Sequence, residues 1–310
     1  MKRVDAHWDT ALMLADKSSL EYLPEAHCDY QRLREYMDIA FFALFFYPGK
    51  LPADQLYTAF NQRLDALIAD IKRPQSGIQL LLSAAQVNET GKLALIGAEG
   101  AEFLGGEATA INYLTEAFNK GLRLLGLTWN NRTALAGGCG SGEEGNLTPL
   151  GEQVVHLCND LGVLLDGAHL APASLADLLR ISKKPIIVSH TCCATLGPDW
   201  YPRNLTDQQL RSVAEQGGVT GIAFVPAFLG GSPGIARIVE HIRHAVNIAG
   251  IEHVGIGSDF DGTELPADLE GLQSLPLVYE ELQKSGFKAA ELDKIIGSNF
   301  CRVLSEVLPV

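Results

Sequence analysis

Short apolar runs alternate with longer amphipathic segments along almost the whole chain. The apolar runs are rich in β-branched and aromatic residues and are six to eight residues long, which is typical of strands. The strands predicted from these runs cover residues 3–9, 39–46, 93–100, 122–129, 162–169, 185–190, 218–225 and 253–260.

The segments between these runs show the spacing of apolar residues that is typical of helices. Residues 53–72, 148–161 and 206–216 are the clearest examples. The last of them opens with Thr206 and Gln209, which have the spacing of a capping box. Strands that are apolar throughout and alternate with helices predict a parallel sheet that is buried on both faces.

Chain length narrows the choice among α/β folds. A (β/α)8 TIM barrel typically needs about 250 residues, and this chain has 310. We therefore expect one barrel domain over residues 1–310, with small insertions, among them residues 18–38, and a C-terminal helical extension after residue 286.

The first predicted strand does not follow the apolar pattern. Asp5, His7 and Asp9 alternate with apolar or neutral residues, so the three would point to one side of an extended segment. By itself this pattern fits either a solvated edge strand or a metal site.

The barrel prediction favours the metal site, because chemistry in such barrels collects at the C-terminal ends of the strands. Three imidazoles and three carboxylates lie at predicted strand ends: His7, Asp9, Glu99, His169, His190 and Asp259. Nearby acids such as Asp166 and Asp261 show that a single strand-end acid means little. Six convergent ligands exceed what one tetrahedral ion needs, so we expect two Zn²⁺, or other divalent ions, sharing a bridging carboxylate.

Composition excludes several classes of partner. The net charge of −13 argues against nucleic acid and anionic membranes, and no apolar run is long enough to span a bilayer. The chain opens without a signal-peptide pattern, and its six scattered cysteines suit a reducing compartment, so we expect a cytoplasmic protein. Whether it forms a homodimer stays open.

With this ligand set, the sequence closely resembles the renal (membrane) dipeptidase family of zinc metallopeptidases, and its bacterial members in particular. The resemblance runs nearly the whole length of the chain and opens with a D-x-H-x-D motif. The matching segments are DAHWDT, FFALFF, GAEG, GLRLLGLTWN, NLTPLGEQVVHLCNDLGVLLDGAHLA, PIIVSHTCCATL, RNLTDQQL, HVGIGSDFDG and GSNFCRVL.

The resemblance implies a role for each strand-end residue. One zinc ion would be held by His7, Asp9 and Asp259, and the other by His169 and His190, with Glu99 as the bridge and a shared water as the nucleophile.

It also implies how the substrate would be handled. Arg203 would receive the terminal carboxylate of a dipeptide, and Asp259 would carry the proton from the water to the leaving amine.

The chain departs from the best-studied members of that family at two positions. Trp129, in the expected substrate-binding region, and Glu102 each stand where those members have a histidine. We expect a dipeptidase acting on small dipeptides with free termini, including those with a C-terminal D-residue. The alternatives are a related amidase or lactonase, and a metal-binding barrel without catalytic activity.

Overall fold

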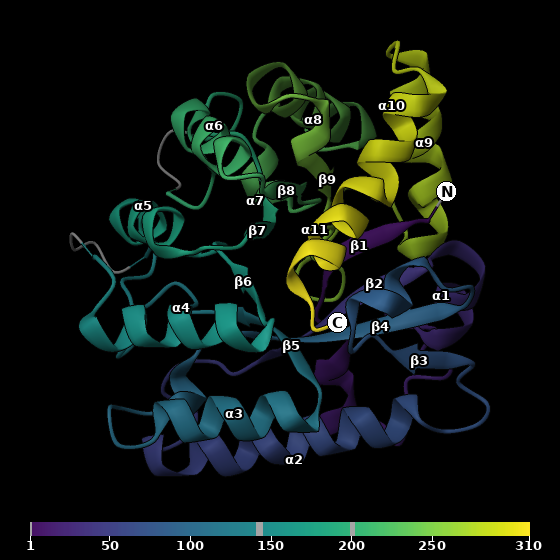
Figure 1. Cartoon of the computed structure of the whole chain (residues 1–310). Coiled ribbons are helices and arrows are strands. Elements are labelled where there is room, and N and C mark those ends of the chain that lie inside the picture. The colour runs from purple at the N-terminus through teal and green to yellow at the C-terminus, as the bar shows by residue number, and fades with distance from the viewer. Residues whose placement is uncertain (1, 141–144, 199–201) are drawn as a thin grey trace.

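The computed structural model describes residues 2–140, 145–198 and 202–310. Its centre is a parallel sheet with the strand order β1-β2-β4-β5-β6-β7-β8-β9 (Figure 1). The strands are β1 Val4–Trp8, β2 Ile39–Phe45, β4 Lys92–Glu99, β5 Leu122–Gly126, β6 Leu164–Asp166, β7 Ile187–Thr191, β8 Val219–Ile222 and β9 Val254–Ile256. The sheet closes on itself through a bridge between Trp8 and Phe260, whose carbonyl oxygen accepts the Asp9 N–H at 2.8 Å. The predicted (β/α)8 barrel is confirmed.

Every predicted strand is present, but several end earlier than expected. The strands predicted at 162–169 and 253–260 stop at Asp166 and Ile256. His169 and Asp259 lie three residues beyond these strand ends and have φ angles of 63° and 65°. Their left-handed conformation is not that of a strand, so their side chains project from the segments that follow the strands. The sequence also gave no sign of β3, the three residues Ile78–Leu80, which pair with β4.

Helices surround the barrel, and Figure 1 shows α2 to α6 and α8 around the strands. The α-helices are α1 Tyr30–Tyr36, α2 Ala53–Ile71, α3 Ala110–Lys120, α4 Pro149–Leu161, α5 Pro172–Ile181, α6 Asp207–Glu215, α7 Pro226–Leu229, α8 Ile235–Ala249, α9 Leu275–Lys284, α10 Ala289–Asp293 and α11 Asn299–Val307. Shorter helical turns are η1 Thr10–Ala15, η2 Ala84–Asn88, η3 Glu102–Leu104, η4 Ile251–His253, η5 Leu272–Ser274 and η6 Lys294–Ser298.

Two details of these helices bear on the sequence analysis. The predicted capping box at the start of α6 is confirmed, because Thr206 accepts the Gln209 N–H at 3.3 Å and the Gln209 side chain accepts the Thr206 N–H at 2.9 Å. None of the helices that the structure describes is both long and apolar enough to cross a bilayer.

The C-terminal extension closes one end of the barrel. Phe300, Val303 and Leu304 of α11 are buried in one cluster with the first residues of the strands, among them Val4 and Ile39. Burial of this apolar helix face against the strand starts stabilises the barrel through the hydrophobic effect. Side chains of the described residues fill this end, whereas the opposite end, where the strands finish, borders a cavity.

Candidate metal centre

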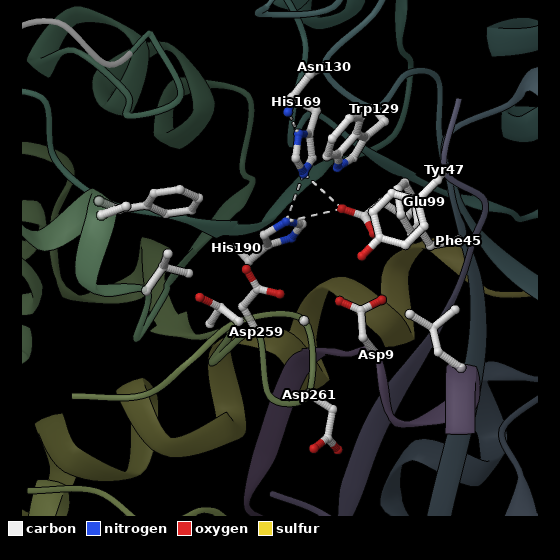
Figure 2. Close-up of a pocket in the computed structure, with 16 residues that line it drawn as sticks. Asp9, Phe45, Tyr47, Glu99, Trp129, Asn130, His169, His190, Asp259 and Asp261 are labelled. Atoms are coloured by element: carbon white, nitrogen blue, oxygen red, sulfur yellow. Dashed lines mark hydrogen bonds and ion pairs between the residues drawn. The ribbon is translucent and has the colours of Figure 1, made fainter. Parts of the chain in front are cut away.

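The six residues predicted from the strand ends come together at the open end of the barrel. Five of them line a cavity of about 290 Å³: Asp9, Glu99, His169, His190 and Asp259 (Figure 2). The sixth, His7, is 2% exposed and lies against these carboxylates. Among the described residues that line the cavity, four are carboxylates and none is lysine or arginine.

The buried position of β1 answers the question raised by its sequence. Asp5, His7 and Asp9 are 0%, 2% and 5% exposed, because β1 pairs with β2 on one side and meets the β9 end of the sheet on the other. A solvated edge strand is therefore excluded.

Glu99, the last residue of β4, lies between two histidine groups. Its Oε2 is 3.6 Å from Nε2 of His7. Its Oε1 is 2.8 Å from Nε2 of His169 and 3.4 Å from Nε2 of His190, as the dashed lines in Figure 2 show. One carboxylate thus presents a different oxygen to each group.

The contact between Glu99 and His169 tests whether a cation fits. Nδ1 of His169 lies 2.8 Å from the amide oxygen of Asn130 and donates its proton there. Burial, with the nearby charge of Arg203, lowers the pKa of His169 to about 4, so the ring is neutral at neutral pH. Its Nε2 is then a lone pair that faces a carboxylate oxygen at 2.8 Å. Two buried acceptors at this distance repel each other, and a metal ion bound by both would remove the repulsion, so the residues present fit a metal ion.

A second group of possible metal ligands lies around His7. Its Nε2 is 3.5 Å from Oδ2 of Asp9 and 4.0 Å from Oδ1 of Asp259. Nε2 of His7 and Oδ1 of Asp9 are buried and have no hydrogen-bond partner in the described part of the chain. In addition, one possible ligand atom from each of His7, Glu99 and His190 lies within 4.8 Å of the other two. Imidazole nitrogens and carboxylate oxygens in this mixture suit Zn²⁺ or a similar divalent ion.

The pKa shifts of these residues show that the buried carboxylates and the histidines influence one another strongly, and that the carboxylates favour a positive charge close to them. Burial opposes a charged His7, but the carboxylates of Glu99 and Asp9 raise its pKa well above the ordinary value. Burial would raise the pKa of Glu99, yet His7 and the other two histidines hold it well below the ordinary value. Burial raises the pKa of Asp259 to about 7, and the charges of Asp9 and Glu99 act in the same direction.

Arg203 lies beside the cluster and not in the main cavity. It is 4% exposed, and its Nη2 donates to the carbonyl oxygen of His190 at 2.7 Å. Its guanidinium carbon is 5.4 Å from the centre of the Phe228 ring. Arg203 lines an adjoining cavity of about 330 Å³, which shares Trp129 and Asn130 with the main one.

Trp129 forms an aromatic side of the main cavity together with Phe45 and Tyr47 (Figure 2). Its ring centre is 5.2 Å from that of Phe45 and 6.0 Å from that of His169. Glu102, at the start of η3, does not line this cavity, and burial raises its pKa. The two departures from the family pattern therefore differ, because only Trp129 lies where it can contact a ligand.

Two polar residues that line the cavity, Asn130 and Asp261, are not among the site residues predicted from the sequence. Asn130 follows a predicted strand and could have been found by the same strand-end rule as the ligands. The sequence suggests no role for Asp261, but its carboxylate accepts the Thr10 hydroxyl at 2.5 Å and the His27 N–H at 2.6 Å. These bonds hold the turn that carries Asp259.

The chain matches a known protein family over its whole length. The family model of the membrane dipeptidases (peptidase family M19) matches residues 1–310. An uncharacterized protein in the pqqA 5' region of Klebsiella pneumoniae is 34% identical over 280 residues, which cover 84% of this chain and 98% of the relative. Dipeptidase verJ of Clonostachys rogersoniana is 32% identical over 257 residues, which cover 80% of this chain and 65% of the relative.

The fold has a similar counterpart among solved structures. The crystal structure of a metallo peptidase from Rhodobacter sphaeroides, liganded with a phosphinate mimic of the dipeptide L-Ala-D-Ala, has a TM-score of 0.90. It is 24% identical, and the match covers 99% of each chain. The family match extends over the whole chain, barrel and C-terminal helices included. The chain therefore belongs to the membrane dipeptidase family, peptidase family M19, and is a hydrolase of peptide bonds.

Proposed function

We propose that the chain is a binuclear metallo-dipeptidase that hydrolyses small dipeptides with free termini. The observation that carries the proposal is the position of Glu99. Its Oε2 faces His7 at 3.6 Å and its Oε1 faces His169 at 2.8 Å. A carboxylate that directs one oxygen toward His7 and the other toward His169 can bind two cations at once.

The chain's donors divide between two ions. His7, Asp9 and Asp259 would hold one ion, and His169 and His190 would hold the other, with Glu99 shared. We assign His190 to His169 and not to His7, because their Nε2 atoms are 3.0 Å apart and both face Oε1 of Glu99. When bound, two zinc ions would supply Lewis-acid polarisation of the peptide carbonyl and a more acidic water.

The size of the cavity supports a small substrate. Its volume of about 290 Å³ is at the lower end of the range for small-molecule sites, roughly 300 to 1,000 Å³. Phe45, Tyr47 and Trp129 supply an apolar side against which the side chain of a residue can pack.

Arg203 supports recognition of a free carboxylate. Its guanidinium is buried, and its Nε has no hydrogen-bond partner among the described residues. A guanidinium binds a carboxylate through two parallel hydrogen bonds. Because Arg203 contacts the backbone of His190, a carboxylate held there would lie near the metal ligands.

Asp259 supports proton transfer during hydrolysis. A pKa of about 7, raised by burial, allows this carboxyl group to take and release a proton near neutral pH. Its carboxylate would accept the proton of the attacking water and would then give it to the leaving amine.

Trp129 favours a second candidate function, hydrolysis of another small acyl substrate by a related amidase or lactonase. An indole beside His169 offers only one N–H donor where the best-studied family members have an imidazole, so the substrate range can differ.

One screen separates the two candidates. The zinc-loaded enzyme would be assayed on L,L and L,D dipeptides, on their amides and N-acetyl derivatives, and on an ester and lactone panel. The L,D set is included because of the mimic bound to the Rhodobacter sphaeroides protein. We expect turnover of free dipeptides, none with His190→Ala, and little with blocked termini. Preference for blocked substrates or lactones would refute the dipeptidase proposal, and no turnover of any substrate would favour the inactive barrel.

A further inference from the structure

A chain of hydrogen bonds leads from His190 away from the cavity. Nδ1 of His190 is 2.8 Å from Oγ of Ser189, and that hydroxyl donates to Oδ2 of Asp166 at 2.5 Å. The three residues are 1%, 0% and 5% exposed, so water does not compete for these bonds. Asp166 is the last residue of β6, and the other two lie in β7.

The donors around Asp166 fix the direction of this chain. Its Oδ1 accepts the backbone N–H groups of Ala168 and Ser189, both at 2.9 Å, and its Oδ2 accepts the Ser189 hydroxyl. Burial raises the pKa of Asp166, and the three donors that point at its carboxyl group oppose this shift and favour the ionised form, which can only accept. The single hydroxyl proton of Ser189 therefore points to Asp166, and Oγ is left to accept the Nδ1 proton of His190.

We propose that Asp166 and Ser189 are positioning residues for the metal centre, which hold His190 in the tautomer with its proton on Nδ1 and its lone pair on Nε2. The inference rests on the proposed metal centre. Nε2 is the atom that faces Oε1 of Glu99 at 3.4 Å. A buried anion behind the ring also makes Nε2 a stronger donor to a metal ion.

The two histidines assigned to one ion are therefore supported unequally. His169 is backed by the neutral amide oxygen of Asn130, which lines the cavity. His190 is backed by the Ser189 hydroxyl, which is itself bonded to the buried carboxylate of Asp166. We expect His190 to contribute more to the affinity of that site.

The surrounding backbone keeps Ser189 in place. A Cβ atom at Gly221 or Gly257 would lie only 2.0 Å or 1.7 Å from the carbonyl oxygen of Ser189. Gly221 in β8 and Gly257 directly after β9 thus lie close against the backbone of Ser189, so the backbone from which the Ser189 hydroxyl projects is held in place.

The substitution Asp166→Asn tests the direction of the chain with almost no change of shape. The amide oxygen can keep both backbone donors, so the new NH₂ group faces Ser189 and donates to it. The hydroxyl then donates to Nδ1 of His190, and the ring proton moves to Nε2, where it opposes a metal ion. Loss of such a supporting partner typically weakens metal binding by about 10- to 100-fold.

The measurement is the dissociation constant of each zinc ion, obtained by competition with a chelator. In Asp166→Asn we expect one zinc ion to be held about 10- to 100-fold more weakly than in the wild type. Ser189→Ala removes the hydrogen bonds between His190 and Asp166 without reversing their direction, so it should weaken zinc binding less. It is the variant to measure if Asp166→Asn does not fold. The matched control is Asp5→Asn. Asp5 is also buried and accepts backbone N–H groups of Ser258 and His7, but in the described structure no side-chain hydroxyl links it to a histidine ring as Ser189 links Asp166 to His190.

A second readout does not depend on zinc affinity. Two-bond ¹H–¹⁵N correlation spectra report the tautomer of each histidine, and we expect His190 to carry its proton on Nδ1 in the wild type, with and without zinc. A proton on Nε2 in the metal-free wild type, or equal zinc losses in Asp166→Asn and Asp5→Asn, would overturn the inference. Failure of the proposed function would look different, because the wild type itself would bind fewer than two zinc ions. The spectrum of the metal-free wild type would still report which nitrogen of His190 carries the proton.

Discussion

Arg203 donates a hydrogen bond from its Nη2 atom to the carbonyl oxygen of His190, at 2.7 Å. The bond ties the residue expected to bind substrate to the strand that carries a proposed metal ligand. Because Nε of Arg203 has no partner in the described part of the protein, the side chain keeps donor capacity for a ligand. The geometry thus gives Arg203 a structural contact and a free donor at once.

Replacing Arg203 by methionine separates these two roles. For dipeptides we expect kcat/KM to fall, with a loss of transition-state stabilisation of about 1.5 to 3 kcal/mol, the usual cost of a lost hydrogen bond to a charged group. Dipeptide amides lack the carboxylate, so they should be poor substrates of the wild type and should change little. If the variant loses thermal stability and treats acids and amides alike, Arg203 is structural and a general amidase becomes the better proposal.

Glu99→Ala should weaken both metal sites together, because Glu99 faces both histidine groups. Elemental analysis of the wild type after mild purification should approach two divalent ions per chain. His169→Ala is the comparison variant and should weaken one site only. A single tightly bound ion that survives Glu99→Ala unchanged would contradict the bridging role.

Asp259→Asn should keep the fold and lose turnover. The amide cannot carry a proton between water and amine, and this assistance is worth about 10² to 10⁴ in rate. The amide is also a poorer metal ligand, so bound metal is measured in the same sample. A variant with full metal content and a rate within a few-fold of the wild type would show that the proton travels by another group.

Trp129→His should shift the ratio of dipeptide to lactone turnover toward dipeptides, because it places a hydrogen-bonding ring beside His169. It should also cost stability, on the order of 1 kcal/mol, through lost contact with the Phe45 ring at 5.2 Å. Trp129→Phe keeps an aromatic ring and serves as the control. An unchanged ratio in Trp129→His would mean that this position does not set the substrate range.

His241 gives a pH dependence that is independent of the metal centre. Its Nδ1 accepts the Cys193 N–H at 3.0 Å and its Nε2 donates to the carbonyl of Leu229 at 2.9 Å, so the folded state requires a neutral ring. Burial lowers its pKa to about 4 from an ordinary value of 6.5. The unfolded chain therefore binds the proton first, and stability falls as the pH drops from 6.5 toward 4.

The test compares urea unfolding of the wild type and His241→Gln, both with a chelator present, at pH 7.5 and 4.5. The glutamine variant should be less stable at pH 7.5, and the gap should narrow by about 2 to 3 kcal/mol at pH 4.5. A gap that stays constant across this range would show that His241 does not titrate as the burial of its ring requires.

The order of strands and helices could be read from the sequence because it depends on local patterns. Residues 39–46, for example, are apolar without interruption, which predicts a strand buried on both faces, and β2 is such a strand. The capping box at Thr206 is likewise a property of four consecutive residues. The placement of Glu99 and His190 at one end of the barrel followed from strand direction alone.

Other features were decided by the closed barrel. His169 and Asp259 lie in left-handed turns beyond their strands, and no local pattern distinguishes such a turn from two more strand residues. Helix α11 was expected as an extension, but only the assembled strands offer the apolar end that it covers. Strand β3, with three residues, is too short for periodicity to detect.

The electrostatic contacts of the site also needed the tertiary structure. The sequence placed Glu99 near the histidines but could not say which carboxylate oxygen faces which ring. Asp166 looked like an incidental acid, and only the pairing of β6 with β7 brings it behind Ser189 and His190. Periodicity fixes which face of a strand a side chain occupies, whereas contacts of about 3 Å depend on strand register and side-chain rotamers, which the packing of the whole barrel sets.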